Sequence, residues 1–200
     1  MEKEKVIETM MVNPKYSSDQ ISDMATAVAE WGGDYDKLIL YPAETLRAVI
    51  GVAKGWKDSN VKIGSDSDNS ELHYLKAAME IFPSNAGFNP TQITILGMLM
   101  PKVDRGVFVK YCDPKIPYGH IHYILTAVSE GYTAMDNTKY LNYKADQLAE
   151  IYGGFKSKVD VSQYDNPSIP GKTMQLIRHA LEIGYKKISY NADENKLTIE

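Results

Sequence analysis

The chain has 200 residues, 44% of them hydrophobic and 24% charged, which is typical of one soluble globular domain with at most a small appendage. The formal net charge is −4, and no basic stripe interrupts the sequence. Nucleic-acid binding usually needs such a stripe, so we expect no nucleic-acid partner.

No targeting or membrane signal stands out. The first residues, MEKEKVIETMMV, are too charged for the apolar core of a signal peptide. The longest apolar run, 93–100, is too short to span a bilayer. The single cysteine excludes an internal disulfide framework. We therefore predict a cytoplasmic or intracellular protein with no membrane partner and no cofactor.

The N-terminal half reads as helical. Residues 1–16 are expected to form a flexible arm. Apolar residues at helical spacing, with capping types before them and glycine after several of them, then predict four helices. We place these helices at 17–31, 43–54, 71–82 and 91–100, although Ile93-Thr94-Ile95 in the last of them could equally form a strand.

Asp66, Asp68 and Ser70, in the connector before the third of these helices, resemble the first half of a calcium loop. Glu71 stands where the sharp turn needs glycine, and Ala77 stands where a bidentate glutamate is needed. We expect a solvated loop and a helix cap instead.

The region 105–137 carries the densest strand signals. β-Branched and aromatic residues at 107–111 indicate a strand, and 120–128 and 131–135 indicate two more around a tight turn. After it, we expect helices at 142–152 and 172–183 and a terminal hairpin of strands 185–190 and 196–199. No internal repeat is apparent.

Together these elements predict an α+β fold, with N-terminal helices packed on a mostly antiparallel sheet and a C-terminal helix plus β-hairpin. We expect a main domain at 17–155. Residues 156–200 are expected to pack on it as a C-terminal helix and hairpin.

His120 and His122 form the first candidate site. On a strand, side chains two residues apart share a face, so two imidazoles could bind one transition metal. Cys112, Asp113 or Asp136 could supply a third ligand. A metal-binding protein is therefore one alternative, although the spacing alone is a weak signal.

Cys112 is the second candidate. It precedes His120 by a short loop, and a nearby imidazole can activate a thiol by taking its proton. A small, half-buried apolar residue is the simpler interpretation, because nucleophilic cysteines usually lie at helix N-termini.

The phrases Gly106-Val-Phe-Val, Gly119-His-Ile-His and Gly131-Tyr-Thr-Ala-Met-Asp-Asn resemble papain-like cysteine peptidases, in particular the branch that cleaves double-glycine leader peptides. The resemblance covers about 38–152. It places His122 at the catalytic histidine, and Asp136 at the aspartate that orients this histidine.

The same resemblance puts Tyr41 where the family has its nucleophilic cysteine, in the phrase Tyr41-Pro-Ala-Glu-Thr-Leu-Arg-Ala-Val. A phenol cannot replace the thiolate, so the resemblance implies a papain-like scaffold without peptidase chemistry.

We therefore expect a non-catalytic protein that binds or assembles with a protein or peptide partner. The resemblance suggests a groove containing Tyr41, His120, His122, Asp136 and Asn137, and the fourteen tyrosines suggest a tyrosine-rich surface as the other contact. The alternatives are a hydrolase that uses Cys112 or His122 with Asp136, and the metal-binding protein described above.

Overall fold

The computed structural model describes residues 2–63, 70–191, 194 and 196–199. It is almost entirely helical, and within these residues the only strands form one antiparallel hairpin. Its contacts divide the chain into two compact units, Met1–Lys115 and Ile116–Glu200. The expected domain boundaries at 16 and 155 stay a prediction.

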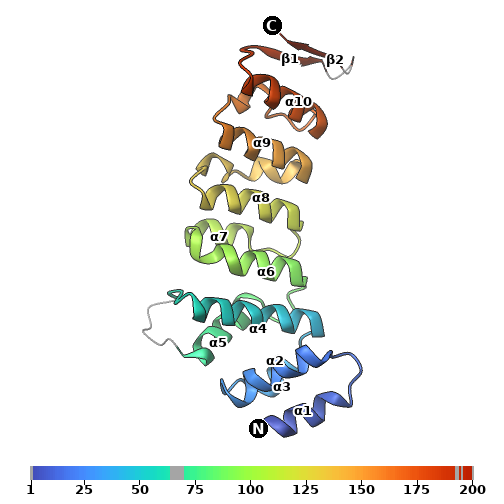
Figure 1. Ribbon diagram of the computed structural model, residues 1–200, viewed down its shortest axis with the longest axis vertical. Coiled ribbons are helices and arrows are strands. Elements are labelled where there is room, and N and C mark those ends of the chain that lie inside the picture. The colour runs from blue at the N-terminus through green and yellow to red at the C-terminus, as the bar shows by residue number, and fades with distance from the viewer. Residues whose placement is uncertain (1, 64–69, 192–193, 195, 200) are drawn as a thin grey trace. The chain divides into compact units, whose positions relative to one another are not determined.

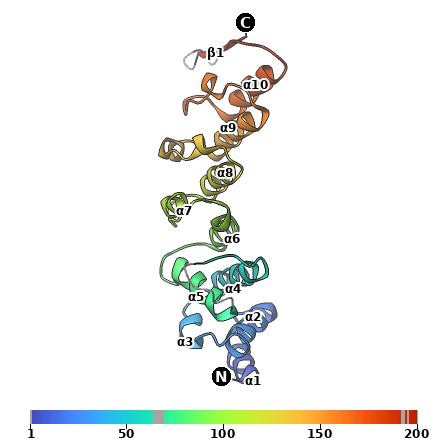
Figure 2. The ribbon, with the colours of Figure 1, turned by 90° about the vertical axis from the view of Figure 1, so that its left-hand side faces the viewer.

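The first unit is a stack of helices with further helices beside it. Its elements are α1 (Lys3–Met11), α2 (Ser18–Ala29), α3 (Tyr35–Leu38), α4 (Ala43–Asp58), α5 (Glu71–Ile81), α6 (Pro90–Leu99), η1 (Met100–Lys102) and α7 (Arg105–Tyr111). Helix α2 packs on α4, and α4 packs on α6 (Figure 1). Figure 2 shows α3, α5 and α7 on one side of that stack. The opposite side is left uncovered by them.

The second unit repeats this plan with shorter connections. Its elements are α8 (Tyr118–Ser129), η2 (Thr133–Met135), η3 (Thr138–Asn142), α9 (Ala145–Ser157), η4 (Val161–Gln163), α10 (Gly171–Glu182), β1 (Ile188–Asn191) and β2 (Lys196–Ile199). Helix α8 packs on α9, and α9 packs on α10. The hairpin pairs Ile188 with Ile199 and Asn191 with Lys196.

Every stacked helix except α1 begins with the same six-residue pattern, which we call the helix-start motif. It consists of a buried apolar residue, a capping residue, two variable residues, a polar residue and an apolar residue. The copies are YSSDQI (16–21), YPAETL (41–46), FNPTQI (88–93), IPYGHI (116–121), YKADQL (143–148) and IPGKTM (169–174). The fold is thus built from a repeated helical unit.

In the copies with Gln92, His120 and Gln147, the polar residue donates to a backbone carbonyl in the segment before the next stacked helix. Gln92 Nε2 donates to the Pro114 carbonyl at 3.1 Å, and Gln147 Nε2 donates to the carbonyls of Pro167 at 2.9 Å and Ile169 at 2.6 Å. Because these carbonyls precede the next helix, successive helices within a unit start at the same end and run parallel.

The capping residue decides which polar residue the motif contains. After Ser17, Asn89 and Lys144, which have a backbone N–H, the polar residue is glutamine, whose Oε1 accepts that N–H. Proline has no N–H, and after Pro42, Pro117 and Pro170 the polar residue is threonine or histidine. The presence or absence of a backbone N–H on the capping residue therefore explains why the polar residue is glutamine in some copies and threonine or histidine in others.

The expected α+β fold and its papain-like topology are wrong. Residues 107–111 lie in α7, 120–128 in α8 and 131–135 mostly in η2. β-Branched residues favour strands only weakly, and burial on neighbouring helices overrides that preference. The decisive signals were the caps: Asp104 caps α7 through its carboxylate, and the motif at Pro117 starts α8.

The expected helices are confirmed in α2, α4, α5, α6, α9 and α10, and the terminal hairpin is present. Helix α4 continues past Gly55, and α9 continues through Gly153 and Gly154. The expected arm contains α1, whose Val6 and Met10 are buried on α2. Asp66 and Asp68 of the calcium-like loop, and most of the hairpin turn 192–195, lie outside the described residues.

Candidate functional site: the groove between α4 and α6

In most stacked pairs of helices, a side chain closes the surface between the two helices. Between α2 and α4, Lys54 pairs with Asp23, and Arg47 lies 3.4 Å from Asp19. Between α9 and α10, Arg178 Nε donates to Glu150 at 2.8 Å, and both side chains are only 16% exposed.

Between α8 and α9 the closing side chain is aromatic. The ring of Tyr152 lies 6.5 Å from that of Tyr123 and 6.2 Å from that of Tyr132. Its hydroxyl donates to Glu130 at 2.6 Å. The position is the same as in the previous pair, because Tyr152 and Arg178 are each the eighth residue of their helices.

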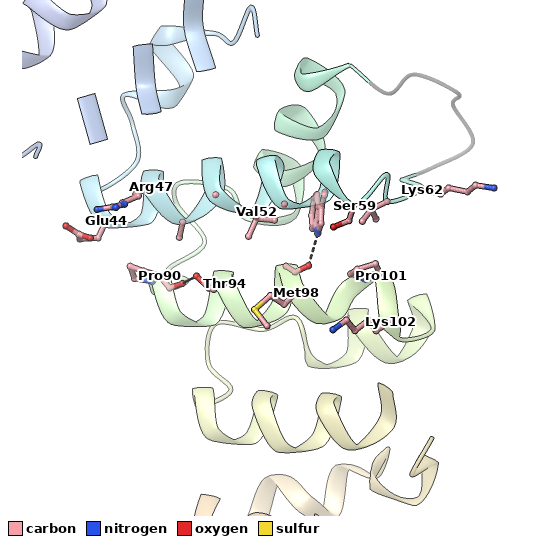
Figure 3. Close-up of a pocket in the computed structure, with 16 residues that line it drawn as sticks. Glu44, Arg47, Val52, Ser59, Lys62, Pro90, Thr94, Met98, Pro101 and Lys102 are labelled. Atoms are coloured by element: carbon pink, nitrogen blue, oxygen red, sulfur yellow. Dashed lines mark hydrogen bonds between the residues drawn. The ribbon is translucent and has the colours of Figure 1, made fainter. Parts of the chain in front are cut away.

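The pair α4 and α6 lacks such a side chain, and a groove of about 980 Å³ opens between the helices (Figure 3). The eighth residue of α6 is Gly97, and the residue of α4 that corresponds to Tyr123 is Ala48. The groove lies wholly within the first unit.

The floor of the groove is apolar and tightly packed. A Cβ atom on Gly97 would overlap the Val52 side chain, so glycine is required for the close approach of the two helices. Trp56 is 3% exposed, and its indole donates to the Gly97 carbonyl at 2.7 Å. Met98 rises from this floor with 54% of its surface exposed.

The α4 wall contains two glycines that the fold does not require. A Cβ atom on Gly51 or Gly55 would meet nothing within 4 Å, and neither residue has a positive φ. Glycine inside a helix costs about 1 kcal/mol relative to alanine. These two residues therefore widen the groove at a cost in stability.

The charges around the groove are mostly positive. Glu44 and Arg47 lie at the end where the helices start, and Lys62 and Lys102 lie at the other end. Glu44 accepts from Gln20 at 3.2 Å, whereas Lys102 has no ion pair within the part of the chain that the structure describes. Figure 3 shows the Lys102 amine turned toward Met98.

A smaller cavity of about 530 Å³ lies between α3 and α5, next to Tyr41. Tyr41 is 2% exposed and donates to the Phe82 carbonyl at 2.9 Å; burial raises the pKa of its phenol to about 12. It is the first residue of a helix-start motif. Its role is therefore explained by packing, and it does not line the α4/α6 groove.

His120 is the polar residue of the motif that starts α8. Its Nε2 donates to the Tyr143 carbonyl at 2.6 Å, which makes it the histidine counterpart of the linking glutamines. Pro117 offers no N–H, and Nδ1 of His120 accordingly has no hydrogen-bond partner among the described residues.

His122 lies on a different face of α8 from His120, because the segment is a helix and not a strand. Its ring stacks on Tyr118 at 5.8 Å and meets the edge of Tyr123 at 5.0 Å. Its Nδ1 is buried without a hydrogen-bond partner in the described structure, so no carboxylate orients that nitrogen.

Asp136 and Asn137 lie between η2 and η3. Asp136 is half-buried and follows η2, and the side chain of Asn137 caps η3 by accepting the Lys139 N–H at 3.0 Å.

The sequence did not predict a cluster of hydrogen bonds around Asp165. Its carboxylate accepts from Lys139, Tyr140 and Tyr143 at 2.6–3.0 Å. These bonds tie η3 to the loop before α10.

Cys112 ends α7 in the first unit. Burial, with a smaller effect of Asp113, raises the pKa of its thiol to about 11. A nucleophilic cysteine needs a lowered pKa, so the environment of Cys112 opposes thiolate formation.

Across the described ranges, no three side chains of histidine, cysteine, aspartate or glutamate come close enough to hold a metal ion. No helix in the same ranges is long and apolar enough to cross a membrane.

No protein-family model, curated protein or solved structure matches this chain. The repeated helix pairs within the chain can instead be compared with one another.

Proposed function

We propose that this protein is a helical-repeat scaffold that binds a segment of a partner protein in the groove between α4 and α6. The observation that carries the proposal is the open surface of this pair, where the pairs α2/α4, α8/α9 and α9/α10 carry closing side chains. The expected protein or peptide partner is retained, and the papain-like scaffold is replaced.

The dimensions and lining of the groove support this function. Its volume falls in the range of about 300–1,000 Å³ that is usual for ligand sites. Above the buried Val52 and Trp56, the exposed Met98 offers an adaptable apolar contact for side chains of a partner. Repeat proteins commonly bind partners along the surfaces that their stacked helices create.

The two wall glycines give a second line of support. Both residues line the groove, and a Cβ atom at either position would meet nothing within 4 Å, so the backbone accepts a larger residue there. Such a residue would also favour helix formation relative to glycine. The present sequence thus keeps the groove open at positions where a larger residue would stabilise the fold.

The test uses the full chain and a displayed library of random peptides. Peptides selected on the wild-type protein are measured against Gly55→Leu, which fills the groove, and against Lys76→Leu. The control places the same side chain on the exposed face of α5, beside the smaller cavity. Because a Cβ atom at position 55 meets no atom within 4 Å, circular dichroism of Gly55→Leu should show an unchanged helix content.

We expect the selected peptides to lose at least about tenfold in affinity for Gly55→Leu, equivalent to about 1.4 kcal/mol, and to keep their affinity for Lys76→Leu. Peptides that bind both variants as well as the wild type would refute the proposed site. Peptides that lose affinity only for Lys76→Leu would move it to the cavity beside Tyr41.

A further inference from the structure

The α8/α9 pair shows what fills a groove of this kind. Tyr152 of α9 and Glu130 at the end of α8 occupy the positions that Gly97 and Gly55 hold in the first unit, counted from the helix starts. The phenol lies between the helices and donates to the carboxylate at 2.6 Å. An aromatic ring is therefore one side chain that this repeat geometry accommodates at this position; the arginine of the α9/α10 pair is the other.

In the α4/α6 pair, both members of that closing contact are replaced by glycine. The remaining lining suits a ring supplied from outside, because the exposed thioether of Met98 makes favourable contacts with aromatic groups. Ala48 replaces Tyr123, so the ring that packs beside Tyr152 in the second unit is also absent here.

The charged residues that line the groove indicate the second feature of the partner segment, an acidic group. Arg47, Lys62 and Lys102 line the groove against the single carboxylate of Glu44, in a chain whose net charge is −4. Arg47 is already near Asp19, but Lys102 forms no ion pair with any described residue. A carboxylate on the partner segment would complement the end of the groove at which Lys62 and Lys102 lie.

From this internal comparison we infer that the groove binds an acidic partner segment that inserts an aromatic side chain above Gly97, between Ala48 and Gly55, and places a carboxylate beside Lys102. The inference rests on the proposed function and specifies its ligand. An aromatic anchor in a pocket with charged residues at the rim is the usual form of a small protein–protein contact.

The test measures the Kd of labelled synthetic peptides by fluorescence anisotropy with the full chain. One peptide has a tryptophan flanked by glutamates, the second replaces the tryptophan with alanine, and the third replaces the glutamates with lysines. The protein variants are Gly55→Leu, Lys102→Glu and Lys110→Glu. The last makes the same charge change on the exposed face of α7, outside the groove.

We expect the first peptide to bind at least about tenfold more tightly than the alanine peptide, because anchors of this kind contribute about 2 kcal/mol or more. Gly55→Leu should abolish this difference. Lys102→Glu should weaken the acidic peptide and strengthen the lysine peptide, and Lys110→Glu should change neither beyond about twofold.

Equal binding of the tryptophan and alanine peptides, or the absence of a reversal with Lys102→Glu, would overturn the inference. The proposed function fails separately. If library-selected peptides depend on Gly55 but lack aromatic and acidic residues, the groove is a peptide site with a different ligand. If no selected peptide depends on Gly55, both proposals fail.

Discussion

The α4/α6 and α8/α9 pairs start from the same motif but differ in what lies between the helices. In the second unit, Tyr152 and Glu130 close the surface through a ring and a hydrogen bond. In the first unit, Gly97 and Gly55 stand at these positions, and a groove remains. The repeated backbone thus supports either a closed structural contact or an open binding surface.

The difference teaches where the constraints lie. The helix starts have similar requirements in both units. The first backbone N–H groups of each helix need hydrogen-bond partners, and Gln92 and Gln147 also bond to the segment before the next helix. The eighth position varies more: it holds tyrosine in α9, arginine in α10 and glycine in α6, and the buried Ala25, Ile50 and Leu125 in α2, α4 and α8. Function is most readily placed at such a variable position.

The largest expected change in stability concerns the helix-start motif, which both helix pairs share. Gln147→Leu should lower the free energy of unfolding by about 2–4 kcal/mol, since it leaves the Lys144 N–H and the Pro167 and Ile169 carbonyls without their partner. Urea unfolding measures the change. Gln175→Leu, on the exposed face of α10, is the control and should stay within about 0.5 kcal/mol. Equal effects would mean that the motif does not link the helices.

A smaller loss should follow when the closed pair is opened. Tyr152→Ala removes the ring contacts with Tyr123 and Tyr132 and the hydrogen bond to Glu130. We expect about 2–3 kcal/mol of destabilisation by urea unfolding, below the cost for a fully buried aromatic residue. Tyr185, which is 48% exposed, gives the matched control Tyr185→Ala. An unchanged stability would show that the ring does not close this surface.

The glycines of the open pair should respond in opposite directions to the same substitution. Gly97→Ala drives a methyl group into Val52 and should cost about 1–3 kcal/mol. Gly55→Ala meets no atom and should stabilise the protein by about 1 kcal/mol through helix propensity. Thermal unfolding of the two variants tests this directly. Stabilisation by both substitutions would contradict the close approach of α4 and α6 at Gly97.

Much of the helical structure could be predicted from the sequence because its signals are local. Ser17 and Asn89 are strong caps, with glutamine at the third helical position of each helix, and the structure confirms both capping boxes. The strand predictions failed at α8 because β-branched and aromatic residues were read without the start signal at Pro117. A local preference of this kind is weaker than packing on a neighbouring helix.

The repeat was present in the sequence but hidden by its variation. Glutamine, threonine and histidine share one position because the capping residue before them differs, so the copies have little identity. The phrase from Tyr41 to Leu46, which suggested a peptidase nucleophile, is one of these copies. The pattern becomes visible when six-residue segments of the sequence are aligned on the buried apolar residue and on the polar residue of the motif.

The groove could not be predicted, because it depends on residues far apart in the chain. Gly51 and Gly55 read as ordinary helix residues, and Gly97 as an interruption of an apolar run. Only the pairing of α4 with α6 shows that one glycine is required by Val52 and that the other two face open space. The groove exists because side chains are absent at these glycines, and absent side chains leave no motif in the sequence.

The smallest expected effect is a pH dependence that, in the closed pair, involves the carboxylate of Glu130. Burial, together with the hydrogen bond to Glu130, raises the pKa of the Tyr152 phenol from 10.0 to about 12. The unfolded chain therefore loses this proton first, so the contribution of Tyr152 is complete below pH 10 and declines as pH rises toward about 12. Tyr152→Phe removes the ionisable group, and its unfolding free energy should fall less steeply over that interval.

Tyr41→Phe provides the comparison in the first unit. Burial alone raises the pKa of Tyr41 to about 12, so this substitution should also flatten the pH dependence. Only at Tyr152 should the effect depend on a second residue: Glu130→Gln should lower the pKa of the Tyr152 phenol by removing the carboxylate, as followed by the ultraviolet absorbance of the phenolate. If Glu130→Gln leaves the titration unchanged, the ring and the carboxylate are not in contact in solution. The closed pair would then lose the hydrogen bond that distinguishes it from the groove between α4 and α6.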